Sequence, residues 1–146
     1  MATRKATAEW KGGLQDGGGT FAVESDVVSG SYSVKSRFTD DGEGGATNPE
    51  ELVAAAHASC FSMQFAALLE LAGHKAESVE TEAEVQILKE GEGFAIKKIE
   101  LTTSARVPGI EEDAFQQAVQ AAKDNCPVSV ALGAVPSISV NATLES

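Results

Sequence analysis

Two cysteines, Cys60 and Cys126, are the residues of this sequence best suited to covalent chemistry. A thiolate is a strong nucleophile, and two thiols that meet in a fold can cycle between a dithiol and a disulfide. The alternative is that both are inert core thiols, because free cysteine is among the most buried residue types.

The two cysteines are 66 positions apart, and the chain has only two histidines, His57 and His74. A zinc site needs several clustered ligands, so we expect no metal.

The local settings of the two thiols differ. Cys126 precedes Pro127 at the start of a predicted helix, where unpaired backbone N–H groups stabilise a thiolate. Cys60 falls in the middle of a long predicted helix, too far from its N-terminus to gain from the helix dipole, so a reactive Cys60 needs a neighbouring cation. The candidate arginines are Arg4, Arg37 and Arg106. His57, on the same helix face as Cys60, is a further candidate, although we favour a core histidine bonded to the backbone.

Composition and charge narrow the choice of partners. The chain has 146 residues, enough for one domain over 1–146, and a net charge of −11. This charge repels phosphate backbones and anionic lipid, so we expect no nucleic acid and no membrane as partner, and favour a neutral or apolar substrate. The one long apolar stretch, Leu52–Leu69, is interrupted by His57 and Gln64. We interpret it as a buried helix in a cytoplasmic protein.

Hydrophobic periodicity and turn residues predict an α+β fold with antiparallel sheets around a long helix. Asn48 is a good N-cap for this helix, Pro49 suits its first position, and Gly73 ends it. Strands are expected at Ala6–Trp10, Thr20–Ser25, Tyr32–Phe38, Glu80–Leu88, Phe94–Thr103 and Ser137–Leu144. Glycine turns are expected at Gly12-Gly13, Gly17–Gly19 and Gly30, an acidic loop at Thr39–Thr47, and a helix at Glu111–Lys123.

Four segments of the chain resemble a known family. Thr47–Leu52 (TNPEEL) and Ala54–Phe61 (AAAHASCF) are similar to the signature of the OsmC/Ohr family, the osmotically inducible protein C and organic hydroperoxide resistance proteins. Val107–Ile110 (VPGI) and Cys126–Ser129 (CPVS) match further segments of the family in the same order. The resemblance covers nearly the whole chain, and the two cysteines with their surrounding motifs make it specific.

The resemblance implies a thiol peroxidase that reduces organic hydroperoxides and is built as an intertwined homodimer. It implies that Cys60 is the attacking thiolate, that Cys126 resolves it through a Cys60–Cys126 disulfide, and that Glu50 is the acid of the Asn-Pro-Glu segment. The family's arginine lies in the first hairpin in the Ohr branch, where this chain has Leu14-Gln15-Asp16. In the OsmC branch it lies shortly before the Asn-Pro-Glu loop, where Arg37 matches, so we assign the chain to the OsmC branch. The implied reductant is an external dithiol, with lipoyl-type dithiols among the candidates, and no cofactor is required.

Two other functions remain open for the same residues. One is a redox sensor without turnover, and the other is a binding module in which both thiols are inert.

Glu50 and Cys60 are ten residues apart, which on one helix is about 15 Å along the axis and about 80° around it. We therefore predict that Glu50 and Arg37 of one subunit serve Cys60 of the other. Three apolar neighbours of Cys60 either favour alkyl hydroperoxides over hydrogen peroxide or simply belong to the core: Phe61, Met63 and Phe65.

Overall fold

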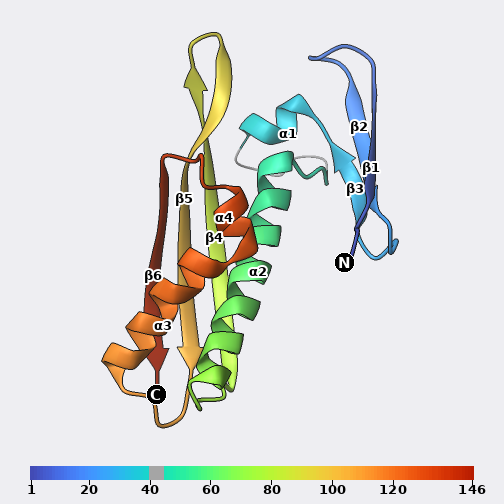
Figure 1. Ribbon diagram of the computed structural model, residues 1–146. Coiled ribbons are helices and arrows are strands. Elements are labelled where there is room, and N and C mark those ends of the chain that lie inside the picture. Colours follow the sequence, from blue (N-terminus) through green and yellow to red (C-terminus); the bar gives the residue numbers. More distant parts are fainter. Residues whose placement is uncertain (40–44) are drawn as a thin grey trace. The chain divides into compact units, whose positions relative to one another are not determined.

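The computed structural model describes residues 1–39 and 45–146 and divides into two compact units, Met1–Leu52 and Val53–Ser146 (Figure 1). Most of the acidic loop expected at Thr39–Thr47 lies outside the described residues. The elements form two three-stranded sheets and a long helix, which confirms the α+β class. That the whole chain acts as a single domain stays a prediction.

The first unit contains an antiparallel sheet. β1 (Ala6–Lys11) pairs with β2 (Gly18–Val23), and β2 pairs with β3 (Ser29–Tyr32). The glycines at 18, 19 and 30 were expected in turns but lie within strands. At Gly19 the reason is a close approach, because the ring of Tyr32 fills the space that a side chain would occupy.

A short helix, α1 (Val34–Phe38), replaces most of the strand expected at Tyr32–Phe38. Ser33 is its N-cap: the Ser33 hydroxyl accepts the N–H of Ser36 at 3.0 Å, and the Ser36 hydroxyl accepts the N–H of Ser33 at 3.0 Å. This reciprocal capping box satisfies two N–H groups that a helix start leaves unpaired. It makes the helical turn locally favourable, and it places Arg37 on α1.

The long helix α2 (Pro49–Leu71) begins and ends where the sequence predicts. The side-chain oxygen of Asn48 accepts the N–H of Glu51 at 2.9 Å, and Gly73 follows the helix with a φ of 87°. By length and composition α2 could cross a membrane, because an 18-residue stretch of it has a mean hydropathy of 1.6. Of that stretch, 22% is buried inside the structure. The expectation of a buried helix is therefore wrong for the single chain, because most of α2 is open on at least one side.

The second unit contains the larger sheet, in the order β4-β5-β6. β4 (Ser78–Glu90) and β5 (Gly93–Arg106) form an antiparallel hairpin that turns at Gly91, whose φ is 60°. β6 (Ser137–Glu145) pairs with β5 in parallel, so the expectation of wholly antiparallel sheets is wrong here. A parallel pair needs a crossover, which the chain makes through α3 (Glu112–Asn125) and α4 (Pro127–Ala131).

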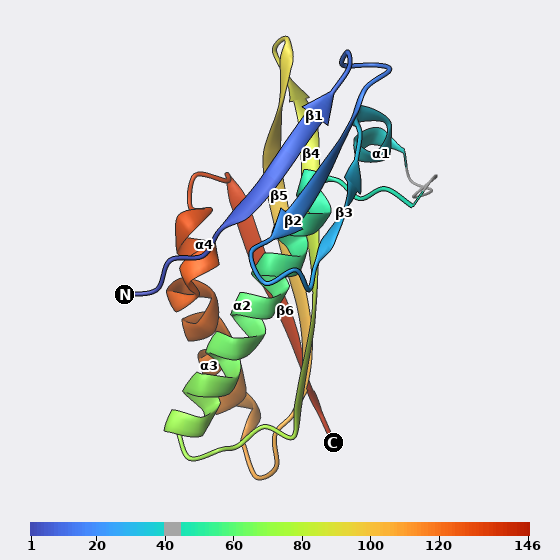
Figure 2. The same cartoon turned by 90° about the vertical axis from the view of Figure 1, so that its right-hand side faces the viewer.

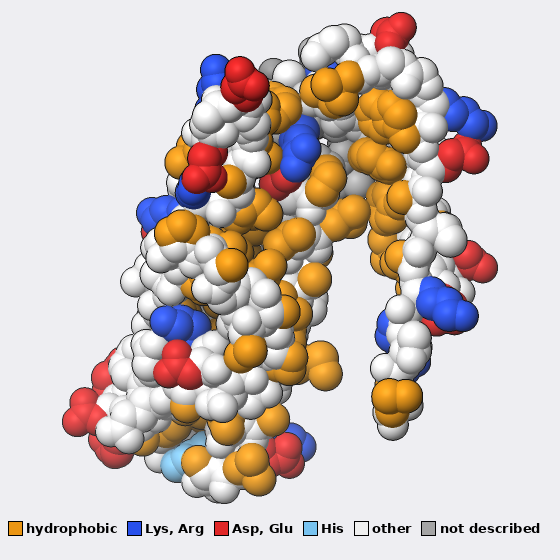
Figure 3. Space-filling model, turned by 45° about the horizontal axis from the view of Figure 1, so that its top comes forward, with side chains coloured by type: hydrophobic (Ala, Val, Ile, Leu, Met, Phe, Trp, Pro, Cys, Tyr) orange, Lys and Arg blue, Asp and Glu red, His pale blue; other side chains and the backbone are white. Residues whose placement is uncertain are grey.

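The core of the second unit lies between this sheet and the helices α2 and α3, which cover one of its faces (Figures 1 and 2). Fully buried side chains four residues apart on α2, Phe61, Phe65 and Leu69, pack with Leu101 of β5 and Phe115 of α3. The rings of Phe65 and Phe115 meet edge to face with centroids 5.4 Å apart. This packing fixes the face of α2 that turns inward. Elsewhere, hydrophobic side chains reach the surface over large areas (Figure 3).

Candidate active site

Cys60 and Cys126 lie together in the second unit. Cys60 is on α2, and Cys126 is the residue between α3 and α4, where it caps both helices. Both cysteines are free, and Cys60 packs against the core cluster that contains Cys126, close enough for each thiol to affect the pKa of the other. Cys126 is 0% exposed, whereas Cys60 is only half-buried. A molecule arriving from solvent therefore reaches Cys60 first, with Cys126 behind it.

The start of α4 makes Cys126 the more acidic of the two thiols. Burial alone raises the pKa of Cys126, but hydrogen bonds from the Ser129 N–H, the Cys60 thiol, the Ser129 hydroxyl and the Val128 N–H outweigh it and lower the pKa below its usual range. This agrees with the expectation that the N–H groups of this helix start favour a Cys126 thiolate. Burial raises the pKa of Cys60, and the adjacent Cys126 raises it further against a hydrogen bond from the Val128 N–H. Activation of Cys60 therefore needs a cation.

His57 lies in the core, as expected, but it is bonded to a side chain rather than to the backbone. Its Nε2 is 2.6 Å from the hydroxyl oxygen of Ser129, and both residues are buried. Burial lowers the pKa of His57, which keeps the ring neutral near neutral pH. Sequence reasoning gave Ser129 no role, because no local pattern connects two residues 72 positions apart.

Arg37 and Glu50 form an ion pair in the first unit. Nε of Arg37 donates to both carboxylate oxygens of Glu50 at 3.0 Å, and Nη2 donates to Oε1 at 2.6 Å. Glu50 is 7% exposed, whereas the side chain of Arg37 is 37% exposed. The carboxylate therefore fixes the guanidinium while part of the cation stays accessible. The four residues singled out from the sequence thus form two pairs, Arg37 with Glu50 and Cys60 with Cys126, each within its own unit.

An apolar pocket of about 290 Å³ opens beside Arg37 in the first unit. The rings of Trp10 and Tyr32 lie against each other there, with centroids 5.7 Å apart. The other lining residues are Leu14, Ser33, Val34 and Pro49. A mainly apolar wall with one cation suits a ligand that has an apolar body and a polar head. Sequence reasoning missed this pocket because its walls come from segments far apart in the chain.

The apolar neighbours of Cys60 do not form such a pocket. Phe61 and Phe65 are 0% exposed and belong to the core, so of the two alternatives given for them the core one is confirmed for the single chain. Met63 is 75% exposed on another face of α2. The apolar pocket of the described residues therefore lies beside Arg37, and its lining does not include Cys60.

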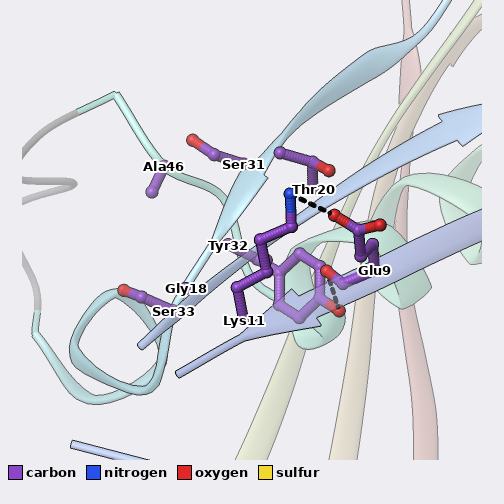
Figure 4. Close-up of a pocket in the computed structure, with 9 residues that line it drawn as sticks. Glu9, Lys11, Gly18, Thr20, Ser31, Tyr32, Ser33 and Ala46 are labelled. Carbon is purple, nitrogen blue, oxygen red and sulfur yellow. Dashed lines mark hydrogen bonds and ion pairs between the residues drawn. The ribbon is translucent and has the colours of Figure 1, made fainter. Parts of the chain in front are cut away.

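Another pocket, of about 320 Å³, lies on the β1-β2-β3 sheet (Figure 4). Lys11 pairs with the carboxylate of Glu9 at 2.9 Å, and the Tyr32 hydroxyl donates to the Glu9 carbonyl at 3.3 Å. Its described lining contains no cysteine, histidine or arginine, so we assign it no part in thiol chemistry. Within residues 1–39 and 45–146, no three His, Cys, Asp or Glu side chains are grouped so that they could hold a metal ion.

Comparison with known proteins identifies the class of protein to which this fold and this thiol pair belong. The model of the family described as OsmC-like protein matches residues 42–141. The chain is 45% identical over 132 residues to Peroxiredoxin OsmC of Escherichia coli (strain K12), a match that covers 90% of each chain. The chain belongs to the OsmC-like family, and the similarity to this relative supports the OsmC branch.

Solved structures of relatives have the same fold over almost their whole length. The organic hydroperoxide resistance protein OsmC of Legionella pneumophila matches with a TM-score of 0.73 and 24% identity, over 99% of this chain and 100% of that one. The organic hydroperoxide resistance protein OhrB of Bacillus subtilis matches with a TM-score of 0.70 and 26% identity, over 99% of this chain and 98% of that one. The α+β architecture is therefore shared across both branches.

Proposed function

We propose that this protein is a thiol peroxidase that reduces organic hydroperoxides, with Cys60 as the attacking thiolate and Cys126 as the resolving thiol. The observation that carries the proposal is the asymmetry of the pair: the two cysteines pack together, Cys60 is half-buried and Cys126 has no exposure. An oxidant from solvent meets Cys60 while its resolving partner is already in contact. The names of the Escherichia coli and Bacillus subtilis relatives, a peroxiredoxin and an organic hydroperoxide resistance protein, support the same chemistry.

The reaction follows from the order in which the thiols are reached. The Cys60 thiolate attacks an oxygen of the hydroperoxide, the O–O bond breaks, and the alkoxide leaves and takes up a proton to form the alcohol. Cys60 is then a sulfenic acid. The Cys126 thiolate attacks its sulfur, a disulfide forms, and hydroxide leaves and is protonated to water. An external dithiol, for which we propose a lipoyl-type carrier, resets the pair by thiol–disulfide exchange.

Cys60 needs a neighbouring cation. We propose that this cation is Arg37 of the partner subunit, held in place by Glu50 of the partner subunit. The arginine of the second unit, Arg106, is exposed at the end of β5. Glu50 and Cys60 are both on α2, and ten residues of helix rise by about 15 Å, more than a glutamate side chain spans. A twofold dimer removes the difficulty, because each subunit then completes the site of the other.

The uncovered face of α2 supports a homodimer. It is made of apolar and small residues at helical spacing that the single chain leaves exposed: Leu52, Ala55, Ala56, Ser59, Met63, Ala67 and Leu71. An apolar stripe of this length in water is typical of a surface that another chain covers. We propose that a second copy covers it in an intertwined dimer. Two free thiols in contact suit a reducing compartment, so we place the protein in the cytoplasm.

We further propose that the pocket beside Arg37 holds the alkyl group of the hydroperoxide. Its apolar lining favours a substrate with a hydrocarbon body, and the guanidinium at its edge can stabilise the negative charge on the departing oxygen. Hydrogen peroxide has no group to fill this pocket, so it gains nothing from the apolar wall.

The test is steady-state turnover of tert-butyl hydroperoxide and of hydrogen peroxide with dihydrolipoamide as reductant. We expect multiple turnovers and a higher kcat/KM for the alkyl hydroperoxide. Trp10→Ala should reduce that preference, whereas Val27→Ala, an exposed side chain outside the pocket, serves as matched control. A single oxidation without turnover would instead identify a redox sensor, and slow thiol labelling without oxidation would identify an inert binding module.

A further inference from the structure

His57 and Ser129 form a buried polar contact that the peroxidase chemistry above does not use. The two side chains come from α2 and α4, and Nε2 of His57 lies 2.6 Å from the Ser129 hydroxyl oxygen. His57 is 0% exposed and Ser129 is 7% exposed. The other ring nitrogen, Nδ1, is also buried and has no hydrogen-bond partner among the described residues.

The unpartnered nitrogen fixes the direction of this hydrogen bond. A proton on Nδ1 would be a buried donor without an acceptor, an arrangement that folded proteins largely avoid. The proton of the neutral ring is therefore on Nε2, and Nε2 donates to the hydroxyl oxygen of Ser129. The hydroxyl of Ser129 accepts this bond and is left to donate its own proton elsewhere.

The thiol of Cys126 lies at the same helix start as that hydroxyl, because Cys126 is the N-cap of α4 and Ser129 is its third residue. The donors at this helix start are the Ser129 hydroxyl and the N–H groups of Val128 and Ser129, which no helical carbonyl pairs. Every one of these groups is a donor, so the pocket around the sulfur is arranged for an anion. The same contacts lower the pKa of Cys126 in spite of its burial.

We propose that His57 is a positioning residue for the resolving step: it holds the Ser129 hydroxyl so that its proton points at Cys126, which keeps Cys126 ready as the thiolate that attacks the Cys60 sulfenic acid. This inference rests on the proposed function. In that attack the S–S bond forms as the S–O bond breaks, and the hydroxide that leaves takes a proton from solvent to become water. His57 and Ser129 keep their protons throughout, so they orient the nucleophile rather than exchange protons with it.

The first test separates the two chemical steps by rapid mixing with one equivalent of tert-butyl hydroperoxide. Ser129→Ala and His57→Leu should slow the conversion of sulfenic acid to disulfide by roughly ten- to a hundredfold, the loss expected for one hydrogen bond to a charged group. The rate of the peroxide step should fall much less in both variants. His57→Gln should restore most of the disulfide rate, since its amide N–H can donate to Ser129, and Ser129→Thr should do the same by keeping the hydroxyl. If His57 and Ser129 had a purely structural role, His57→Gln and Ser129→Thr would not selectively recover the rate of disulfide formation.

The second test needs no peroxide, so it separates this inference from the proposed function. In a Cys60→Ser background, the far-ultraviolet thiolate absorbance at neutral pH reports Cys126 alone. Adding Ser129→Ala or His57→Leu should reduce it, and His57→Gln should largely preserve it. If both substitutions leave the absorbance and the disulfide rate unchanged, the inference is wrong even in an active peroxidase. If the absorbance falls as expected but the wild type shows no turnover, the proposed function fails and the assignment of His57 stands. Ser129→Ala removes a single oxygen atom, so it keeps the test decisive if His57→Leu does not fold.

Discussion

Oxidation of Cys60 and Cys126 to a disulfide within one chain should make the protein markedly more stable. The two cysteines are 66 positions apart, and the segment between them contains β4, β5 and α3. Closing a loop of this length removes conformational entropy from the unfolded chain worth about 4 kcal/mol, which is a ceiling because any strain in the folded state subtracts from it. For a chain of this size that corresponds to a rise in Tm of about 10 °C.

The assay compares thermal unfolding of hydroperoxide-oxidised and dithiol-reduced protein at one protein concentration. The oxidised wild type should unfold at the higher temperature and run as a monomer on a denaturing gel, because the bond is internal. Cys126→Ser supplies the control, since it can be oxidised at Cys60 but cannot close the loop. The reasoning would be refuted if oxidation raised the Tm of Cys126→Ser as much as that of the wild type. A disulfide-linked dimer as the main oxidised product would also refute it.

Three further predictions concern the groups around the thiols. Arg37→Ala should raise the pKa of Cys60 and slow the peroxide step more than Arg106→Ala does, as measured by alkylation rate against pH; the reverse order would transfer the role to Arg106. Mixing inactive Cys60→Ser subunits with inactive Glu50→Ala subunits should restore one working site per heterodimer, and heterodimers that form but stay inactive would contradict a shared site. Burial lowers the pKa of His57 below its unfolded value of 6.5, so the unfolded chain takes up a proton first as the pH falls. The free energy of unfolding should then fall by up to about 1.4 kcal/mol per pH unit below pH ~6.5, and His57→Gln should remove that component in urea titrations.

Local signals in the sequence were enough to place the elements that carry the site. Asn48 and Gly73 mark the ends of α2 by capping, and Cys126-Pro127 marks the start of α4, so the setting of each thiol could be predicted. The error at α1 has the same origin, because the Ser33 capping box is also a local signal and was overlooked in favour of alternating side chains.

Features that depend on contacts between distant segments could not be predicted from one sequence. Alternation identifies β6 as a strand but does not say which strand it pairs with or in which direction, so its parallel pairing with β5 was missed. The contact between His57 and Ser129 is likewise a product of how α4 packs on α2. The pocket beside Arg37 appears only when β1, β3 and α1 are brought together. The family resemblance supplied the roles of the two cysteines, which composition alone left open.

The most direct test of the central claim is hydroperoxide consumption by the wild type, Cys60→Ser and Cys126→Ser under identical conditions with a dithiol reductant. The wild type should turn over repeatedly, and Cys60→Ser should consume nothing, because a serine hydroxyl has no accessible anion near neutral pH. Cys126→Ser should consume one equivalent and then lose activity as Cys60 is over-oxidised, which intact-mass measurement detects as added oxygen. Activity in Cys60→Ser, or equal sustained rates for the wild type and Cys126→Ser, would contradict the account.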